Sequence, residues 1–372
     1  MYNIENKTKE ILNGCIIKSK SGINLYTPDG KGFYPALWTR DFAYMVEYGR
    51  DLICPEDIKN CIDYLIDGAR ETDGWIPDRV DNNGEIWYTA GGRDFPALPN
   101  LDNGQFLVIA ANSYLDMLER DDAEKQFKIW EKSLARGINC LPVNRDCMIE
   151  NNTEPLHSPY GFTDCIKKSG LLSLETLLLW RALKYMAKWC ALCGLENEEY
   201  ESKAKQIEDG FSKIFSDSSG MLYSATETGR KIDIWASCYA LSIDFPLSDD
   251  QKKKIADWLF ENKESYISCG QIRHLHKKEY WDETFIEVDK ETYQNGAYWA
   301  VASGWAFDAL KKYYPEVAVE IISDVLEYFE KDGIYECVNN DYKKLDSYVV
   351  SAVNVYGVYD EYMQLKGLLD RK

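Results

Sequence analysis

Helical periodicity recurs along almost the whole chain, and the helices that it predicts alternate between two kinds. Apolar residues repeat at the spacing of one helix face in about twelve segments, near residues 2–14, 40–53, 55–71, 103–119, 122–139, 168–194, 196–216, 232–243, 248–263, 297–313, 315–331 and 346–369. The odd-numbered helices, such as residues 122–135, carry a charged face that is typical of a solvated helix. The even-numbered helices contain stretches that are apolar nearly all round, such as residues 106–114, which indicates burial. This alternation predicts an all-α (α/α)6 toroid, in which outer helices surround inner ones.

No segment rich in Gly, Ser or Pro divides these helices. The chain has 372 residues, which is enough for one large core or for two domains. Because nothing resembles a linker, we predict a single (α/α)6 barrel catalytic domain over residues 1–372.

The acidic charge balance excludes several classes of partner. Asp and Glu total 62 against 43 Lys and Arg, which gives a formal net charge of −19. Such a surface repels phosphate backbones and anionic lipid headgroups, so we expect neither nucleic acid nor membrane as a partner. The chain also has 11 Trp and 26 Tyr, whose flat faces and polar edges suit ligands with C–H faces and hydroxyl groups. Sugars are such ligands, so a small carbohydrate is the expected partner.

The cysteines predict a reducing environment. The chain has 11 of them, an odd number scattered through apolar patterns, and residues 1–10 contain no apolar signal core. We therefore expect free thiols and a cytoplasmic location. Cys190 and Cys193 have a metal-like spacing, but they lie one turn apart on a predicted helix without a second pair, which favours packing.

The sequence predicts neither a metal nor a cofactor. It has three histidines, of which His274 and His276 would share one face of a strand. No third ligand stands at a credible spacing from that pair. The sequence also lacks a Gly-x-Ser-x-Gly elbow, a phosphate-binding glycine loop and a dinucleotide fingerprint.

Polar and aromatic residues precede the predicted inner helices. In an (α/α)6 barrel the loops from outer to inner helices emerge at one end, so their side chains converge on one site. Alternating residues at 75–88 and 272–281 predict short β-hairpins in these loops, which would deepen the rim of the active-site end. The residues expected to bind substrate there are Trp38, Arg40, Asp41, Arg93, Asp94, Asp102, Asn103, Tyr160, Trp235, His274, Tyr293, Gln294, Asn295 and Trp299.

Trp38, Arg40 and Asp41 are the clearest group among these residues. The carboxylate can accept two hydrogen bonds from neighbouring hydroxyls of a terminal sugar while the indole stacks on the ring. The same Arg-Asp pair could instead cap a helix and form a salt bridge. Two further residues are also open to a second interpretation, because Trp299 could be core and His274 could serve packing.

Glycoside hydrolysis needs one protonated and one ionised carboxyl group, and two residues are candidates. Asp164 lies beside Phe162, where desolvation can raise its pKa as a proton donor requires. Glu336 precedes Asn339 and Asn340, and hydrogen bonds could hold it ionised as the base. The sixth and twelfth helices, which the two carboxyls precede, lie opposite one another in such a ring. Room for a sugar and a water between them predicts inversion.

Simpler interpretations exist for both carboxyls. Asp164 and Ser169 could help to start a helix, and Glu336 could be a rim carboxylate that makes a loop contact. The rivals for either catalytic role lie in loops of the same predicted face: Glu154, Glu283 and Glu287.

At these residues the sequence resembles the six-hairpin glycosidases, which include glucoamylases, trehalases, processing α-glucosidases and α-L-rhamnosidases. Residues 38–41 (Trp-Thr-Arg-Asp) look like the glucoamylase segment in which an Arg-Asp pair holds the non-reducing-end sugar. Residues 160–164 are similar in position to the Gly-Trp-Asp region that carries the general acid in trehalases and processing glucosidases. Glu336 falls where those families place their base. Residues 293–299 look like their Tyr-Trp-Arg-Gly-Pro-x-Trp segment, with Gln-Asn-Gly-Ala in place of Arg-Gly-Pro.

The resemblance implies a metal-independent, inverting glycoside hydrolase that acts on the non-reducing end of a neutral, glucoside-like oligosaccharide. A disaccharide phosphorylase is a related alternative, although Arg40, Arg93 and Arg273 offer few cations for phosphate. The same toroid could carry a sugar epimerase or a polysaccharide lyase, but the first usually centres on histidines and the second wants a basic cleft. A glycan-binding module without turnover is a further alternative.

Overall fold

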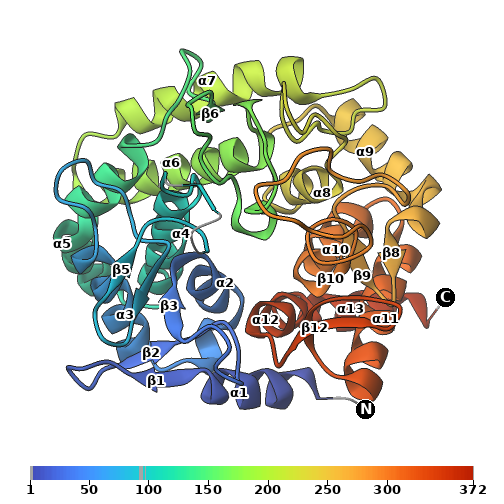
Figure 1. Ribbon diagram of the computed structural model, residues 1–372, viewed down its shortest axis with the longest axis horizontal. Helices are drawn as coiled ribbons and strands as arrows, with labels where there is room; N and C mark the ends of the chain where they lie inside the picture. Colours follow the sequence, from blue (N-terminus) through green and yellow to red (C-terminus); the bar gives the residue numbers. More distant parts are fainter. Residues whose placement is uncertain (1–2, 92–94, 97, 372) are drawn as a thin grey trace.

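An inner and an outer ring of helices form a closed toroid (Figure 1). The computed structural model describes residues 3–91, 95–96 and 98–371. The inner helices are α2 (Thr39–Gly49), α4 (Asn103–Leu115), α6 (Ser173–Cys193), α8 (Ile234–Ser242), α10 (Ser303–Lys311) and α12 (Val349–Gly357). The outer helices are α1 (Ile4–Gly14), α3 (Pro55–Asp67), α5 (Arg120–Asn139), α7 (Glu198–Phe215), α9 (Asp249–Glu261) and α11 (Pro315–Asp332), and α13 (Tyr359–Leu369) follows the ring.

The inner helices contact one another in chain order and close the ring. α2 contacts α4, each following inner helix contacts the next, and α12 returns to contact α2. Each outer helix comes directly before its inner partner in the chain, so the connections between them gather at one end of the barrel. The predicted (α/α)6 toroid is confirmed.

The two kinds of helix differ in burial as their sequences predict. All 13 residues of α4 are buried, because α2, α3, α5 and α6 surround it. In α5 the buried residues recur at helical spacing, for instance Ala123, Phe127, Trp130 and Leu134, and the opposite face is solvated. The stretches that are apolar all round therefore mark the inner ring.

Three predicted helices differ most from those in the structure. The helix predicted from residue 168 begins at Ser173, because β7 (Gly170–Leu171) pairs with β6 (Glu150–Asn151) just before it. The helix predicted from residue 297 begins at Ser303, after β10 (Tyr298–Trp299) and one 3-10 turn. The last predicted helix is in fact two helices, α12 and α13. Asp164 and Ser169 therefore lie in the loop before α6 and do not start that helix.

Short antiparallel strands lie in the connecting loops. One sheet has the order β12-β11-β10-β9-β8, and its hairpin of β11 (Tyr335–Asn339) and β12 (Tyr342–Asp346) precedes α12. The hairpin predicted at 75–88 is present as β4 (Arg79–Asp81) and β5 (Ile86–Trp87), and β3 (Ala36–Trp38) pairs with β4. A separate pair consists of β1 (Ile16–Lys18) and β2 (Asn24–Tyr26).

The second predicted hairpin, at residues 272–281, is not formed as expected. β9 (Gln271–Arg273) pairs with the preceding β8 (Ile267–Ser268), and the chain leaves the sheet after Arg273. His274 is buried and His276 is partly exposed, so the two do not share the face of a strand. The segment after residue 273 is instead a long loop that reaches over the barrel end.

Two findings bear on the surroundings of the protein. Within the described ranges, no helix combines the length and the apolar character that a bilayer span requires. All 11 cysteines are free thiols, and Cys61 and Cys238 are fully buried.

A close approach of α4 and α5 allows a test of the packing. A Cβ at Gly104 would collide with the carbonyl oxygen of Gly137 on α5. Gly104→Ala should therefore lower the free energy of unfolding by about 1–3 kcal/mol, even though Ala is the better helix former. The midpoint of urea unfolding measures this change. Gly367→Ala in α13 is the matched control, because nothing lies within 4 Å of a Cβ there, and it should not destabilise the protein. Equal midpoints for the two variants would contradict the close packing.

Candidate active site

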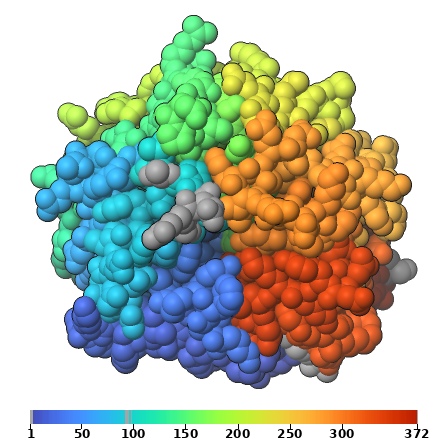
Figure 2. Space-filling view, viewed as in Figure 1, coloured from blue at the N-terminus to red at the C-terminus, as the bar shows by residue number. Residues whose placement is uncertain are grey.

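A cavity of about 250 Å³ opens at the barrel end where the outer-to-inner connections gather. Figure 2 looks onto this end, with the orange segment before β10 on one side of its middle and the cyan segment before α4 on the other. The described residues that line the cavity are Pro28, Tyr34, Trp38, Arg40, Asp41, Gly91, Phe95, Gly161, Phe162, Asp164, Cys165, Ile286, Tyr293, Glu336, Lys344 and Tyr348. They come from loops far apart in the sequence, as the toroid predicts.

Asp164 lies on the cavity wall directly after a 3-10 turn, Gly161–Thr163. Its Oδ1 accepts hydrogen bonds from Nε2 of Gln294 at 2.7 Å and from Sγ of Cys165 at 3.4 Å. The Gln294 Oε1 in turn accepts from the Cys165 amide at 2.8 Å, so the Gln294 side chain fixes both the Asp164 carboxyl and the backbone of the next residue. Burial raises the pKa of Asp164, against the opposing effects of Arg40 and the Gln294 amide.

Glu336, which lies in β11, also lines the cavity, and its carboxyl is almost fully buried. Its Oε2 lies 3.4 Å from Nζ of Lys344, and the Tyr34 hydroxyl lies 3.4 Å from both carboxyl oxygens. Burial raises the pKa of Glu336 to about 7, while Lys344 lowers it and the nearby carboxyls of Asp41 and Asp164 raise it.

The prediction that Asn339 and Asn340 hydrogen-bond to Glu336 is wrong. Asn339 donates to the carboxylate and the carbonyl of Glu291, and Asn340 donates to the side chain of Asn339. Asn339 stands three residues after Glu336 and so faces the other side of β11, and Asn340 lies beyond the end of the strand. Lys344 and Tyr34 are the groups that contact Glu336 instead.

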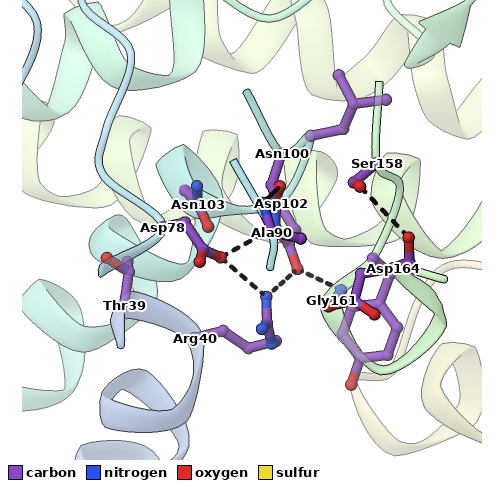
Figure 3. A network of polar contacts seen from close by, with 12 residues as sticks. Thr39, Arg40, Asp78, Ala90, Asn100, Asp102, Asn103, Ser158, Gly161 and Asp164 are labelled. Atoms are coloured by element: carbon purple, nitrogen blue, oxygen red, sulfur yellow. Dashed lines mark hydrogen bonds and ion pairs between the residues drawn. The ribbon is translucent and has the colours of Figure 1, made fainter. Parts of the chain in front are cut away.

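A buried cation holds the loops beneath the cavity together (Figure 3). Nη1 of Arg40 lies 3.3 Å from Oδ2 of Asp102 and 3.8 Å from Oδ1 of Asp78, and all three side chains are almost fully buried. The same Oδ2 of Asp102 accepts the Gly161 amide at 2.8 Å. A Cβ at Gly161 would collide with the Arg40 guanidinium, so only glycine allows this contact. Burial raises the pKa of Asp78 to about 7 despite the two arginines beside it.

The start of α2 explains why Arg40 and Asp41 point into this region. Thr39 donates from its hydroxyl to the Pro77 carbonyl at 2.6 Å and from its amide to the Asp78 carbonyl at 2.9 Å. These bonds fix the first turn of α2 against the segment before β4. Asp41 accepts a hydrogen bond from the Tyr348 hydroxyl at 2.5 Å, and the ion pairs of Arg40 go to Asp78 and Asp102 instead of Asp41. The simple Arg-Asp salt bridge that the sequence allowed is therefore not what these residues form.

Only part of the predicted substrate-binding set lines the cavity. Trp38, Arg40, Asp41 and Tyr293 do so. Arg93 and Asp94 lie outside the described residues. The other eight lie behind the described wall, where they support it without contacting the cavity: Asp102, Asn103, Tyr160, Trp235, His274, Gln294, Asn295 and Trp299.

The aromatic members of that supporting set belong to the core. Trp235 and Trp299 are fully buried and donate from Nε1 to the carbonyls of Ile272 at 3.2 Å and Tyr293 at 3.3 Å. His274 stacks on Trp235 with ring centroids 3.7 Å apart. The Tyr160 hydroxyl hydrogen-bonds the Tyr44 hydroxyl at 2.9 Å. The rings of these four residues pack inward and do not line the described cavity wall.

The polar members of the set fix loops. Asn103 donates to the Ile76 carbonyl at 3.4 Å, and Asn295 accepts the Trp281 amide at 2.9 Å. Asp102 holds Arg40, and Gln294 holds Asp164. Asp102 and Gln294 therefore each orient a residue of the cavity wall, whereas Asn103 and Asn295 fix backbone behind it.

The rival carboxylates do not line the cavity. The side chains of Glu154, Glu283 and Glu287 are all exposed. None of the three histidines lines it either, and His157 hydrogen-bonds the Pro99 carbonyl at 2.6 Å. In the part of the chain that the structure describes, no group of three His, Cys, Asp or Glu side chains could hold a metal ion.

Three polar wall residues were missed by the sequence analysis. Tyr34 shares a run with Trp38, and its place in that run is a signal that could have been used. Tyr348 stands just before α12, as Trp38 stands just before α2. Lys344 gives no local signal, because its place beside Glu336 depends on the pairing register of β11 with β12.

Comparison with known proteins supports the fold. A mannosylglycerate hydrolase of family GH63 from Thermus thermophilus, solved with glucose, is 14% identical, with a TM-score of 0.69 over 96% of this chain and 100% of that one. A rhamnosidase from Klebsiella oxytoca with rhamnose bound is 13% identical, with a TM-score of 0.67 over 96% and 63%. A glucoamylase from Saccharomycopsis fibuligera is 12% identical, with a TM-score of 0.64 over 97% and 95%. No family model and no curated protein sequence matches the chain.

These neighbours are members of the six-hairpin glycosidase superfamily. The chain shares their (α/α)6 fold with short antiparallel strands in the loops, which confirms the fold that the sequence resemblance implied.

The buried network of Arg40 allows a test by stability. Arg40→Met leaves Asp102 buried without its cation and Asp78 with Arg79 alone, so it should lower the free energy of unfolding by about 3 kcal/mol or more at pH 8. Burial already raises the pKa of both carboxyls in the folded state, and loss of Arg40 raises it further. The variant must then take up protons on folding, so the loss should shrink at pH 5 and grow as the pH rises. Urea unfolding at the two pH values measures it.

Arg120→Met is the control for that experiment. Arg120 is exposed on α5 and pairs with Glu124 there, so its loss should change stability little at either pH. A pH-independent loss for Arg40→Met would contradict the account of the buried carboxyls.

Proposed function

We propose that this protein is a glycoside hydrolase in which Asp164 is the general acid and Glu336 the general base. One observation supports this most strongly: two buried carboxyl groups from opposite parts of the inner ring line one cavity. The shared fold with a mannosylglycerate hydrolase, a rhamnosidase and a glucoamylase supports the same reaction class. We also propose that residues 1–372 act as one catalytic domain, which the contact of α12 with α2 supports.

The environments of the two carboxyls suit two different tasks. Burial raises the pKa of Asp164, and its direct partners are a neutral amide and a thiol instead of a cation, so it can stay protonated and donate its proton to the glycosidic oxygen. Glu336 pairs with an ammonium group that holds its pKa down to about 7 against burial, so near and above that pH it can be ionised and take a proton from the attacking water. The glycosidic bond breaks, water supplies the new C–O bond, and the base gains a proton as the acid loses one.

The arrangement supports inversion. Asp164 precedes α6 and Glu336 precedes α12, which lie across the ring from one another, and a sugar with a water on its far side fits between opposed walls. We therefore propose a single displacement by water. A covalent intermediate on either carboxyl is not part of this mechanism.

The cavity supports attack on one terminal sugar of a neutral substrate. A volume of about 250 Å³ is just below the usual range of ligand pockets, which favours a small group such as one sugar ring. Trp38, Tyr34 and Tyr293 offer aromatic faces to the sugar, and Asp41 offers acceptor oxygens for hydroxyl groups. These features support an exo-acting enzyme with a glucoside-like substrate.

Two features weaken the alternatives. A histidine-centred epimerase has little support, because none of the three histidines lines the cavity. Phosphorolysis would need free cations, whereas Arg40 and Lys344, the cations on the described cavity wall, both pair with carboxylates. We further infer a reducing compartment such as the cytoplasm, and the 11 free thiols support it.

Substitution of the two carboxyls tests the catalytic roles. Asp164→Asn and Glu336→Gln should each lower kcat/KM for the cognate glycoside by roughly 10²–10⁴-fold, because each removes one proton transfer. A screen of aryl glycosides and disaccharides with the wild-type protein identifies that substrate first.

Glu283→Gln and Glu287→Gln are the matched controls for this prediction. Both carboxylates are exposed and stand in a loop of the same face, so their loss should leave kcat/KM within about twofold of the wild type. Full activity in either Asp164→Asn or Glu336→Gln would overturn the assignment. Turnover that required inorganic phosphate and released a sugar phosphate would indicate a phosphorylase instead.

A further inference from the structure

Lys344 occupies an unusual position for a lysine. It stands in β12 opposite Cys337 of β11, one residue from Glu336, and its ammonium reaches the cavity wall. Nζ lies 3.4 Å from Oε2 of Glu336 and 3.1 Å from the ring centroid of Tyr293. An aromatic face and a carboxylate therefore hold one ammonium group between them.

The pair is poorly solvated. The side chain of Lys344 is 24% exposed and that of Glu336 is 3% exposed. Solvent and salt screen such a pair much less than one on the surface. The ammonium therefore acts strongly on the charge of the carboxyl that it touches.

The backbone on both sides of this contact adopts sterically unfavourable conformations. Tyr293 has a φ of 39° and Leu345, the neighbour of Lys344, has a φ of 46°. Residues with side chains rarely adopt this left-handed region, and those that do cluster at functional sites. The chain on both sides of the ammonium is thus held in unfavourable conformations by its surroundings.

We propose that Lys344 is a positioning residue that keeps Glu336 ionised and oriented as the base, and so separates its role from that of Asp164. Both carboxyls lose water in one cavity, and burial by itself favours the protonated form of each. Lys344 also lowers the pKa of Asp164, but without direct contact: the direct partners of Asp164 are a neutral amide and a thiol, whereas Glu336 contacts the ammonium itself. This inference rests on the proposed function for its catalytic meaning, but the pairing itself does not depend on it.

Other charged and titratable groups also act on Glu336 and must be considered. These groups are Asp41 on α2, Asp164 before α6, Tyr34 before β3, Tyr293 before β10, Tyr342 on β12, Tyr348 before α12, Cys337 on β11 and Cys165 after Asp164. The phenols and thiols among them stay neutral near neutral pH, because burial raises the pKa of each. The carboxyls of Asp41 and Asp164 oppose ionisation of Glu336. Lys344 favours it, and the Tyr34 hydroxyl, 3.4 Å from both carboxyl oxygens, can donate to the ionised form as well.

The pH dependence of turnover tests the proposal. In Lys344→Met the acidic limb of kcat/KM should move up by about one pH unit or more, since an opposite charge at this distance shifts a carboxyl pKa by about 1–3 units. The value at pH 6 should then fall by roughly tenfold or more relative to the wild type, with a smaller loss at pH 8. Lys344→Arg keeps the charge and should restore most of the limb. Lys344→Gln is a second neutral variant in case Lys344→Met does not fold.

Lys343→Met is the matched control. It removes the same charge from the adjacent residue of β12, but Lys343 pairs with Asp332 at 2.8 Å on the outer side. Its acidic limb should coincide with that of the wild type. A limb that stayed in place in both Lys344→Met and Lys344→Gln would overturn the proposal. A raised KM for acidic substrates alone would show that Lys344 binds an anionic group of the substrate instead.

A second measurement does not depend on activity. Carbonyl-13C NMR of glutamate-labelled protein follows the Glu336 carboxyl through a pH titration, with Glu336→Gln to assign its resonance. The midpoint should rise by about one pH unit or more in Lys344→Met and stay unchanged in Lys343→Met. If the midpoint moves in a protein that hydrolyses no glycoside, the pairing stands and the proposed function fails. If turnover is present and the midpoint does not move, the inference about Lys344 fails by itself.

Discussion

The buried guanidinium of Arg40 is the contact on which the cavity depends. It joins the first turn of α2 to Asp78 before β4 and to Asp102 before α4, and Asp102 also holds the amide of Gly161. Three loops of the barrel end therefore meet at one charge, whose removal would leave Asp102 buried without its cation and Asp78 with Arg79 alone. The loop with Gly161 continues directly into Asp164, so the same network sets the position of the proposed acid.

Burial and charge together explain why two similar carboxyls can do different work. The toroid removes both Asp164 and Glu336 from water, which favours their protonated forms. What differs is the partner: an amide of Gln294 for the first and the ammonium of Lys344 for the second. The ring of apolar helices keeps the surroundings of the cavity low in polarity, and single polar residues in its loops give the two carboxyls different partners.

Much of the fold could be predicted from sequence, because the alternation of charged and wholly apolar helices is a local property of the chain. The positions of Asp164 and Glu336 before opposite inner helices followed from the same pattern. The direction in which each loop side chain points could not be predicted from that pattern. Trp38 and Trp235 both stand near the start of an inner helix, yet one lines the cavity and the other packs in the core. Helical spacing cannot distinguish these outcomes, because the geometry of each loop decides which way an indole points.

Contacts between residues of neighbouring strands could not be predicted from the sequence either. Asn339 and Lys344 are both near Glu336 in the hairpin, but the alternation of side chains along β11 turns Asn339 away, and the return of the chain in β12 brings Lys344 to the carboxyl. The configuration of the first sugar released, read by ¹H NMR before mutarotation, tests the central claim most directly. Two carboxyls on opposed walls with a water between them predict the inverted anomer. Release of the retained anomer would contradict that arrangement.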